Sequence, residues 1–283
     1  MLRSNADRIC AELGPNDRVL DIGGWYQPFN RADVVVDLLP YETRGTGGYR
    51  GPEKERFTAD TWIQHDVSSR RPLPFRDREF DFVTCAHVLE DIRDPVGLCS
   101  ELMRVAKRGY IETPSRLVEQ TYGLEGRNYA GYYHHRWLVE MGDGEVRFRH
   151  KPHLLHGHWP CHFPRSVLRD LPEERWVTFM FWEDRFDAYE VVSVSQIEVR
   201  RELEEFVRRH YRYPAIYRWL DSDWPGAEPR IRPRQVVKKL LQLLPGLRDL
   251  GRPPVAPSIW DGFYEVESRA FEPPRPVPRV PRA

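Results

Sequence analysis

The 283-residue sequence has no net charge, few cysteines and no long apolar run. Lys and Arg number 43, as do Asp and Glu, so the balance gives no reason to expect nucleic acid or an anionic membrane as the main partner. The four cysteines form no C-x-x-C pair, which favours a reducing compartment over a disulfide framework. No apolar run approaches the ~18 residues that span a bilayer. We therefore expect no integral membrane segment.

The two ends of the sequence differ in character. The first residues, "MLRSNADRICAELG", are polar and charged, which is not the pattern of a signal peptide. Together with the cysteine usage, this predicts a cytoplasmic protein. The 25 prolines crowd toward the other end, where they disfavour regular structure.

Residues 1–116 alternate strand-like and helix-like stretches. The strand patterns are "RVLDIGG", "ADVVVDLLP", "TWIQHDV", "FDFVTCAHV" and "YIETPS". A short amphipathic helix at 5–13 precedes the first strand, and "DPVGLCSELMRVAKRG", with an acidic start and a basic end, precedes the last. Three consecutive valines in the second stretch indicate burial on both faces, as in a parallel sheet. The alternation predicts an α/β fold, a doubly wound Rossmann-like sheet that is mostly parallel.

The alternation stops after residue 116. Two alternating arms around Asp143-Gly144 predict a β-hairpin, and two more strands around 183–185 are expected to close the sheet as an antiparallel edge pair. Helices are predicted at 200–220 and at 235–244. The parts are then a core at 1–116, an insertion at 117–170 that caps an acceptor, closing strands at 171–199, a helical extension at 200–250 and a proline-rich tail at 251–283. The tail is expected to be extended or disordered.

Three acids stand at the predicted C-terminal ends of successive strands. Asp21 precedes Gly23 and Gly24, which allow a close backbone approach to a ligand because glycine has no Cβ. Asp37 follows the second strand, where an acid can accept hydrogen bonds from both hydroxyls of a ribose. Asp66 follows the third strand, where it can accept from an adenine amino group. The pattern predicts a site for an adenosine-bearing cofactor.

The turn after the first strand does not suit a dinucleotide. Such sites need G-x-G-x-x-G and hold the pyrophosphate on a helix N-terminus. Here Gly23 and Gly24 are followed by Trp25 and three further residues without glycine. A cofactor without phosphates, such as S-adenosylmethionine (SAM), needs no such cradle.

The ordered phrases "VLDIGG", "VVVDLLP" and "LPFRDREFDFVTCAHVLEDI" resemble the class I SAM-dependent methyltransferases, most closely the small-molecule branch called type 11. The resemblance covers roughly residues 5–116. It implies a transferase that moves a methyl group from SAM to a small molecule, a sugar or a lipid-linked glycan.

The family's roles carry over to matching positions. Those assigned to the cofactor are Asp21, Gly23, Gly24, Trp25, Asp37, Asp66, Val67 and Ala86. His87 follows the fourth strand and would face the sulfonium and the acceptor. The turn departs from the family's D-x-G-x-G-x-G at Trp25 and Gln27, and Glu90-Asp91 stands where the family has Glu-His.

Three histidines are the candidates for catalysis. His87 is placed by the fourth strand, and His134 and His135 lie in the aromatic run "YYHHRW" before the hairpin. Imidazole titrates near neutrality and can act as a general base. Each histidine equally suits a hydrogen-bonded structural role. Glu112, at the end of the fifth strand, has the same two interpretations.

Other features leave alternatives open. "HKPHLLHGHWPCH" has spacings that could chelate zinc, but no familiar zinc signature fits, so we expect a polar loop and no metal. The segment 235–247 suits packing on a core better than a membrane surface. The tail at 273–282 is expected to be disordered, with a partner groove for a polyproline helix as the alternative.

Three competing functions remain. The changed turn at Trp25 motivates a binding or scaffold protein that has kept the fold and lost catalysis. A nicotinamide-dependent oxidoreductase is disfavoured by the missing glycine. A zinc hydrolase would require metal on the histidine stretch.

Overall fold

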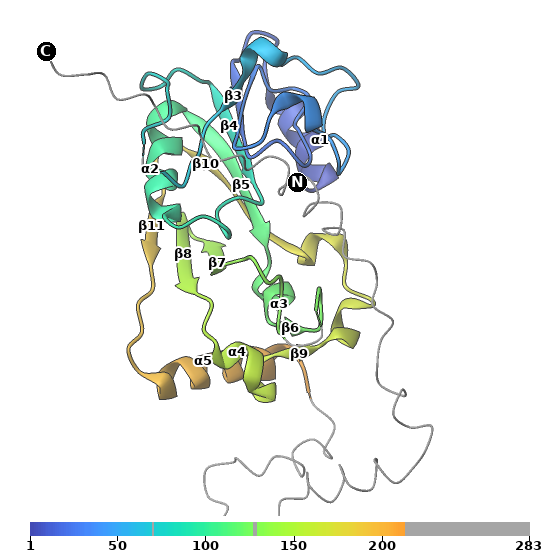
Figure 1. Cartoon of the computed structure of the whole chain (residues 1–283), viewed down its shortest axis with the longest axis vertical. Coiled ribbons are helices and arrows are strands. Elements are labelled where there is room, and N and C mark those ends of the chain that lie inside the picture. Colours follow the sequence, from blue (N-terminus) through green and yellow to red (C-terminus); the bar gives the residue numbers. More distant parts are fainter. Residues whose placement is uncertain (70, 127–128, 213–283) are drawn as a thin grey trace, which may run out of the picture. The chain divides into compact units, whose positions relative to one another are not determined.

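The computed structural model describes residues 1–69, 71–126 and 129–212. The expected helix at 235–244 and the proline-rich tail at 251–283 lie outside these residues. Figure 1 shows the chain with most of its helices and strands labelled.

A six-stranded sheet forms the centre of the fold, in the order β10-β5-β4-β1-β2-β3. Its strands are β1 (Val19–Ile22), β2 (Val34–Asp37), β3 (Trp62–Gln64), β4 (Phe82–Ala86), β5 (Arg108–Pro114) and β10 (Val177–Glu183). The first five run parallel, and β10 lies antiparallel to β5. This confirms the predicted Rossmann-like sheet with an antiparallel edge.

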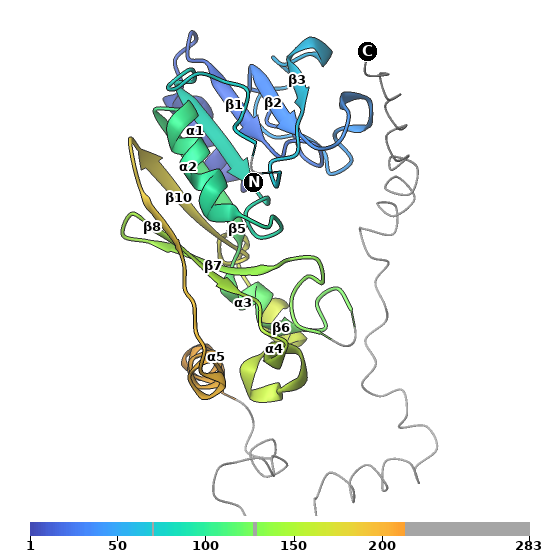
Figure 2. The ribbon, with the colours of Figure 1, turned by 60° about the vertical axis from the view of Figure 1, so that its left-hand side comes forward.

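Two helices cover opposite faces of this sheet (Figure 2). Neighbouring residues of a strand point to opposite faces. Tyr110 of β5 accepts a hydrogen bond on its hydroxyl from Asn5 of α1 (Arg3–Glu12). Ile111 instead packs in one buried cluster with Leu98 of α2 (Pro95–Val105). The strands between these helices are buried on both sides, as the valine run of β2 predicts.

The crossover from β1 to β2 contains no helix. Residues 23–33, all described, pass between the two parallel strands through turns. Two single-turn 3₁₀ helices, η1 (Tyr41–Thr43) and η2 (Ala59–Thr61), lie between β2 and β3. The edge at the C-terminal ends of β1 and β2 is therefore built from loop backbone and not from a helix N-terminus.

The insertion contains the predicted hairpin. Strands β7 (Trp137–Gly142) and β8 (Glu145–His150) pair antiparallel around Asp143 and Gly144, which both have positive φ, 52° and 78°. Such a two-residue turn matches the twist of the strands. The insertion also has α3 (Arg116–Glu119), β6 (Thr121–Tyr122), α4 (Leu154–Gly157), η3 (Trp159–Cys161), β9 (Phe163–Pro164) and η4 (Arg165–Leu168). Strands β6 and β9 pair with each other.

Only one of the two strands expected to close the central sheet does so. After η5 (Glu173–Arg175), β10 pairs with β5, but β11 (Asp187–Glu190) pairs parallel with β8 and extends the hairpin sheet. Asp184, at a φ of 58°, turns the chain away from the central sheet, and the Asp187 amide donates to Gly144 across 2.9 Å. The expectation that both strands of 171–199 close the sheet is thus corrected.

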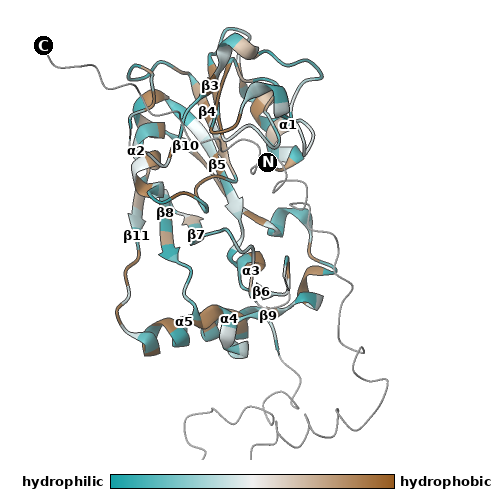
Figure 3. Ribbon diagram, viewed as in Figure 1, coloured by the Kyte–Doolittle hydropathy of each residue, from teal (hydrophilic) through white to brown (hydrophobic). Residues whose placement is uncertain are grey.

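The last described element is α5 (Gln196–His210). Ser195 caps its N-terminus by accepting from the Glu198 amide, so the helix starts four residues before the expected position. Leu203 and Val207 are its buried residues, and hydrophobic and hydrophilic segments alternate along it in Figure 3. None of the helices in the described part of the chain has both the length and the apolar character needed to cross a bilayer.

Candidate functional site

The turn after β1 requires both of its glycines. Gly23 has a φ of 78°, and a Cβ there would lie 2.1 Å from Cγ2 of Val88. A Cβ on Gly24 would lie 2.6 Å from Oδ2 of Asp21. Both distances are shorter than any real Cβ contact. The absence of a Cβ at both glycines therefore lets the turn pack closely against Val88 and Asp21. The backbone of the turn lies at the edge of the sheet.

Asp21 ties this turn to the neighbouring strand. Its side chain is 4% exposed, and its two oxygens accept from the Thr84 hydroxyl (2.6 Å) and from the Phe29 amide (3.0 Å). Burial raises the pKa of Asp21 to about 6, against the lowering effect of these bonds. Asp21 thus shapes the loop that follows β1.

Asp37 at the end of β2 is held by the same loop. Its two carboxylate oxygens accept from the amides of Trp25 (2.9 Å) and Leu39 (2.8 Å). Burial raises its pKa, with the backbone bonds acting in the opposite direction. Trp25 itself is 5% exposed, and its indole nitrogen donates to Oγ1 of Thr43 across 2.8 Å. Trp25 therefore acts on the edge mainly through its backbone amide, which orients Asp37.

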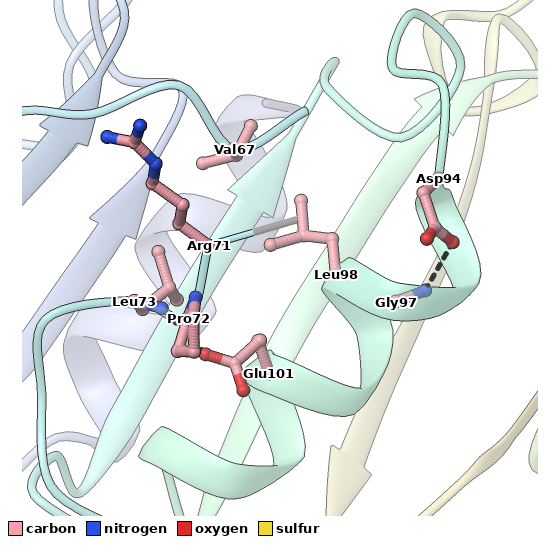
Figure 4. A pocket seen from close by; sticks show the side chains of 8 residues that line it. All are labelled: Val67, Arg71, Pro72, Leu73, Asp94, Gly97, Leu98 and Glu101. Carbon is pink, nitrogen blue, oxygen red and sulfur yellow. Dashed lines mark hydrogen bonds between the residues drawn. The ribbon is translucent and has the colours of Figure 1, made fainter. Parts of the chain in front are cut away.

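Asp66 and Val67 lie beyond the end of β3. Asp66 is exposed and accepts from the Ser68 amide across 2.8 Å. Val67 lines a pocket of about 460 Å³ between this loop and the start of α2, where Asp94 caps the helix by accepting from the Gly97 amide (2.9 Å). Figure 4 shows the eight residues that line it. They are Val67, Arg71, Pro72, Leu73, Asp94, Gly97, Leu98 and Glu101.

His87 follows Ala86, the last residue of β4, and has a positive φ of 59°. Its Nε2 lies 3.0 Å from Oε1 of Glu112, and its Nδ1 lies 3.4 Å from Oε1 of Glu90. Partial burial lowers the pKa of His87, but the two carboxylates outweigh it and the pKa is raised. The imidazole is thereby biased toward its protonated form, which is a poor general base.

Glu112 is a fully buried acceptor. Its carboxylate accepts from the Leu2 amide (2.8 Å) and the Tyr110 hydroxyl, and it pairs with His87 and with the amino group of Met1 (3.1 Å). Burial raises its pKa, but His87 and the amino group lower it more, to about 2. Glu112 is therefore a permanent negative charge beside His87.

His134 and His135 meet Asp91 from a different part of the chain. Nε2 of His134 lies 3.9 Å and Nε2 of His135 lies 3.7 Å from the same oxygen of Asp91, Oδ1. Nδ1 of His135 lies 2.7 Å from Oε1 of Glu119, which also accepts from Lys151. The insertion thus brings both histidines to the loop that follows β4.

The two neighbouring histidines have opposite charge preferences. Burial lowers the pKa of His134 to about 3, and positive charge on His135 adds to this effect. Burial also disfavours charge on His135, but Glu119, Glu90 and Asp91 raise its pKa to about 9. At neutral pH the pair therefore consists of one neutral and one protonated imidazole.

The structure gathers the predicted residues in two groups. Asp21 and Asp37 lie near the C-terminal ends of β1 and β2, and Asp66 follows β3, in the order that parallel topology requires. The three histidines gather beside Glu90 and Asp91: the pKa of Asp91, raised by burial to about 7, responds to both His135 and His87. The roles of all these residues in binding and catalysis stay predictions.

Sequence reasoning missed Glu119, Lys151 and Thr84. Thr84 lies inside β4, and the sequence gives no sign of its bond to Asp21, because threonine is common on either face of a buried strand. Glu119 stands in "SRLVEQT", a mostly polar stretch that gives no signal of its burial. Lys151 directly follows the hairpin. The hairpin returns the chain to Glu119, and Lys151 pairs with it across 2.6 Å, a contact that only the folded structure shows.

The histidine-rich stretch after the hairpin is largely committed to local bonds. Nδ1 of His156 accepts from the Ala130 amide (3.1 Å), and Nδ1 of His162 lies 3.0 Å from the Leu155 carbonyl oxygen. Nε2 of His158 lies 3.2 Å from Glu204, whose carboxylate also pairs with two arginines of α5. The contact of His158 joins the junction of α4 and η3 to α5.

Comparisons with known proteins give one family match. Residues 49–111 match the type 11 family model described as a methyltransferase domain. This stretch includes β3, β4, α2 and the start of β5 with Asp66, Val67, Ala86 and His87, but not the glycine turn or Asp37. A search of curated proteins finds no match.

Solved structures resemble the chain at low identity. The YcgJ protein from Bacillus subtilis is 20% identical, with a TM-score of 0.28 over 40% of this chain and 52% of that one. A SAM-dependent methyltransferase from Mesorhizobium loti is 16% identical, with a TM-score of 0.30 over 52% of this chain and 63% of that one. One from Aquifex aeolicus is 16% identical, with a TM-score of 0.26 over 40% and 65%. The chain thus spans less than two thirds of the length of each.

These structural similarities are too low to carry an argument about activity. The fold rests on the strand order of this chain, and the family rests on the matched stretch, which forms one edge of the candidate site. Residues 49–111 are thus similar to a methyltransferase domain of the type 11 family, and the described chain has the mostly parallel Rossmann-like sheet that the resemblance to class I methyltransferases predicts.

Proposed function

We propose that this chain is a SAM-dependent methyltransferase that transfers a methyl group to a small-molecule, sugar or lipid-linked glycan acceptor. The match of residues 49–111 to a methyltransferase domain carries the proposal. The acceptor classes come from the resemblance to the small-molecule branch. A cytoplasmic location and a protein partner for the proline-rich tail stay predictions.

SAM would lie across the C-terminal ends of β1, β2 and β3, with its ribose on Asp37. A carboxylate offers about four lone-pair positions, and the amides of Trp25 and Leu39 use two of them. Asp37 therefore keeps acceptor capacity for two ribose hydroxyls. The adenine would lie near Asp66 and Val67, where the pocket beside α2 offers an apolar wall and a volume suited to a small ligand.

The reaction is an in-line displacement. A lone pair of the acceptor atom forms the new bond to the methyl carbon while the carbon–sulfur bond breaks and its electron pair returns to sulfur. The product is S-adenosylhomocysteine, and an acceptor hydroxyl also loses its proton. The protein mainly supplies proximity and alignment, because the sulfonium is already activated by its charge. The acceptor would enter beside His87, under the insertion that carries His134 and His135.

A binding protein without catalysis is the second candidate. The observation that favours it is that the protein's own groups occupy the glycine turn. Val88 packs against Gly23, and both carboxylate oxygens of Asp21 accept hydrogen bonds from within the protein. The family match also begins at residue 49, after this turn. In this case the fold would persist without affinity for SAM.

Calorimetry with the full-length chain separates the two candidates. We expect SAM and S-adenosylhomocysteine to bind in the micromolar range, and NADH not to bind. Asp37→Ala should weaken binding of both by about tenfold, corresponding to one or two lost hydrogen bonds. Asp60→Ala, which removes an exposed acid of η2 before the N-terminal end of β3, serves as the matched control.

Two outcomes would overturn the proposal. A folded protein that binds neither SAM nor S-adenosylhomocysteine would favour the binding-protein candidate. Equal affinities in Asp37→Ala and Asp60→Ala would place the cofactor elsewhere. Circular dichroism of each variant shows whether a loss of affinity reflects a loss of fold.

A further inference from the structure

The loop after β4 and the start of the hairpin place three metal-ligating groups around one point. They are the carboxylate of Asp91 and the imidazoles of His134 and His135, whose ligand atoms all lie within 4.8 Å of one another. Asp91 comes from the methyltransferase domain, and the histidines come from the insertion. The cluster therefore exists only because the two parts pack together.

The distances within this cluster are too long for hydrogen bonds. Oδ1 of Asp91 lies 3.7 Å from Nε2 of His135 and 3.9 Å from Nε2 of His134, whereas an N–H···O bond spans about 2.7 to 3.2 Å. Two ligands that each lie about 2.0 to 2.1 Å from a tetrahedral zinc ion are separated by about 3.4 Å. The two distances from Asp91 exceed this separation by only a few tenths of an ångström, and all three ligand atoms lie within 4.8 Å of one another.

The neighbouring groups orient the ligands for that purpose. Nδ1 of His135 lies 2.7 Å from Glu119, so the bond to this buried carboxylate directs Nε2 toward Asp91. A metal-binding histidine usually donates its other ring nitrogen to a carboxylate in this way. Among the described residues, nothing donates a hydrogen bond to Oδ1 of Asp91, although that atom is buried. A cation bound between the two imidazoles would supply the partner that this buried oxygen lacks.

The local charge also favours a cation. Glu90 and Glu119 are about 1% exposed, and Oε2 of Glu125 lies 4.0 Å from Nδ1 of His134. With Asp91, four acidic side chains surround the two histidines. Lys151 is bonded to Glu119 and offsets one of these charges. A divalent ion that replaces the proton of His135 would offset two more.

We propose that Asp91, His134 and His135 form a binding site for a divalent transition metal of the zinc class. Two imidazoles and one carboxylate are borderline donors that suit zinc, iron(II), cobalt(II) or nickel(II) better than magnesium or calcium. Three protein ligands leave a coordination position for water or for an acceptor oxygen.

The site also has a consequence for the proposed function, and this consequence rests on that proposal. An acceptor hydroxyl on the fourth position would lose its proton more easily, because the metal stabilises the alkoxide. The acceptor class would then be an oxygen nucleophile with a hydroxyl to deprotonate. The proposed metal binding does not depend on SAM binding, so it can be tested without SAM.

The experiment uses the full-length chain, treated with a chelator, desalted and titrated with zinc chloride or cobalt(II) chloride in the absence of SAM. We expect one equivalent of metal bound at this cluster, and a cobalt spectrum with ligand-field bands and no thiolate charge-transfer band. Asp91→Asn and His134→Gln should each weaken binding at least tenfold. Glu119→Gln should weaken it about 10- to 100-fold through His135.

Two matched variants give the controls. His153→Gln removes an exposed histidine of the same segment and should leave binding unchanged. Cys161→Ser tests the other group able to hold a metal, which consists of His158, Cys161 and Glu204. Loss of metal in Cys161→Ser, or a thiolate band in the cobalt spectrum, would overturn the assignment. Unchanged affinity in the folded Asp91→Asn and His134→Gln variants would do the same.

Discussion

Lys151 donates a hydrogen bond to Glu119 across 2.6 Å, and both side chains are almost completely buried, at 4% and 1% exposed. Glu119 ends α3, whereas Lys151 directly follows β8. The pair therefore joins the beginning of the insertion to the end of its hairpin. It also supplies the carboxylate that fixes His135, so the structure of the candidate acceptor side depends on it.

Lys151→Met should destabilise the protein by about 3 to 5 kcal/mol, because Glu119 would stay buried with one partner fewer. Lys107→Met is the matched control. Lys107 pairs with Asp81 at the same 2.6 Å, but these side chains are 57% and 32% exposed. Removing that exposed pair should cost less than about 1 kcal/mol. Urea unfolding of both variants gives the comparison, and equal losses would contradict a special role for burial.

Gly23→Ala should destabilise the protein more than Gly144→Ala, although both glycines have a φ of 78°. An alanine in this conformation costs about 1 to 2 kcal/mol at either position. Only Gly23 faces an obstacle, Cγ2 of Val88 at 2.1 Å from the new Cβ, whereas nothing lies within 4 Å at Gly144. Overpacking should add about 1 to 3 kcal/mol at Gly23.

Val88→Ala tests this explanation in a double-mutant cycle. Combined with Gly23→Ala, it should cost less than the sum of the two single changes, because the smaller side chain makes room for the new Cβ. Additive costs, measured as free energies of unfolding, would show that Val88 is not the obstacle.

Asp21 should make the stability depend on pH in a defined direction. Burial raises its pKa from 3.8 to about 6, so the folded protein holds a proton that the unfolded chain has already lost. The resulting stabilisation is fully present below about pH 4 and is lost as the pH rises through about 6, by roughly 3 kcal/mol in total.

Asp21→Asn removes this contribution, along with the bond from Phe29 at every pH. The free energy of unfolding of the wild type minus that of the variant should therefore fall by roughly 3 kcal/mol between pH 4 and pH 7. Urea titrations at four pH values measure it. A difference that stays constant, or that rises with pH, would show that Asp21 is ionised in the folded protein throughout.

The sequence alone was enough to predict the main elements of the core. The valine run of β2, the capped and amphipathic α2 and the Asp143-Gly144 hairpin are all encoded by local patterns of apolar residues, glycine and capping groups. The order of the acids at the strand ends follows from parallel topology, so their position along one edge of the sheet could be predicted as well. Such features depend on residues that are close together in the sequence.

The tertiary structure decided what the sequence could not. Strand β11 joins the hairpin sheet because it pairs with β8, which is distant in the sequence, and no local pattern indicates such a pairing. Trp25, predicted to contact the cofactor, is buried and acts through its amide on Asp37, since a side chain's burial depends on its neighbours in space.

The same limit applies to the histidines. The sequence identified His87, His134 and His135 as reactive side chains, but imidazole has nearly the same intrinsic pKa everywhere in a chain. Burial lowers the pKa of His134, whereas Glu90, Glu112 and Glu119 raise the pKa of His87 or His135 against the effect of burial, and both influences exist only in the folded protein. Electrostatic energies depend on distance and burial, so the sequence determined which groups are present and the fold determined their charge.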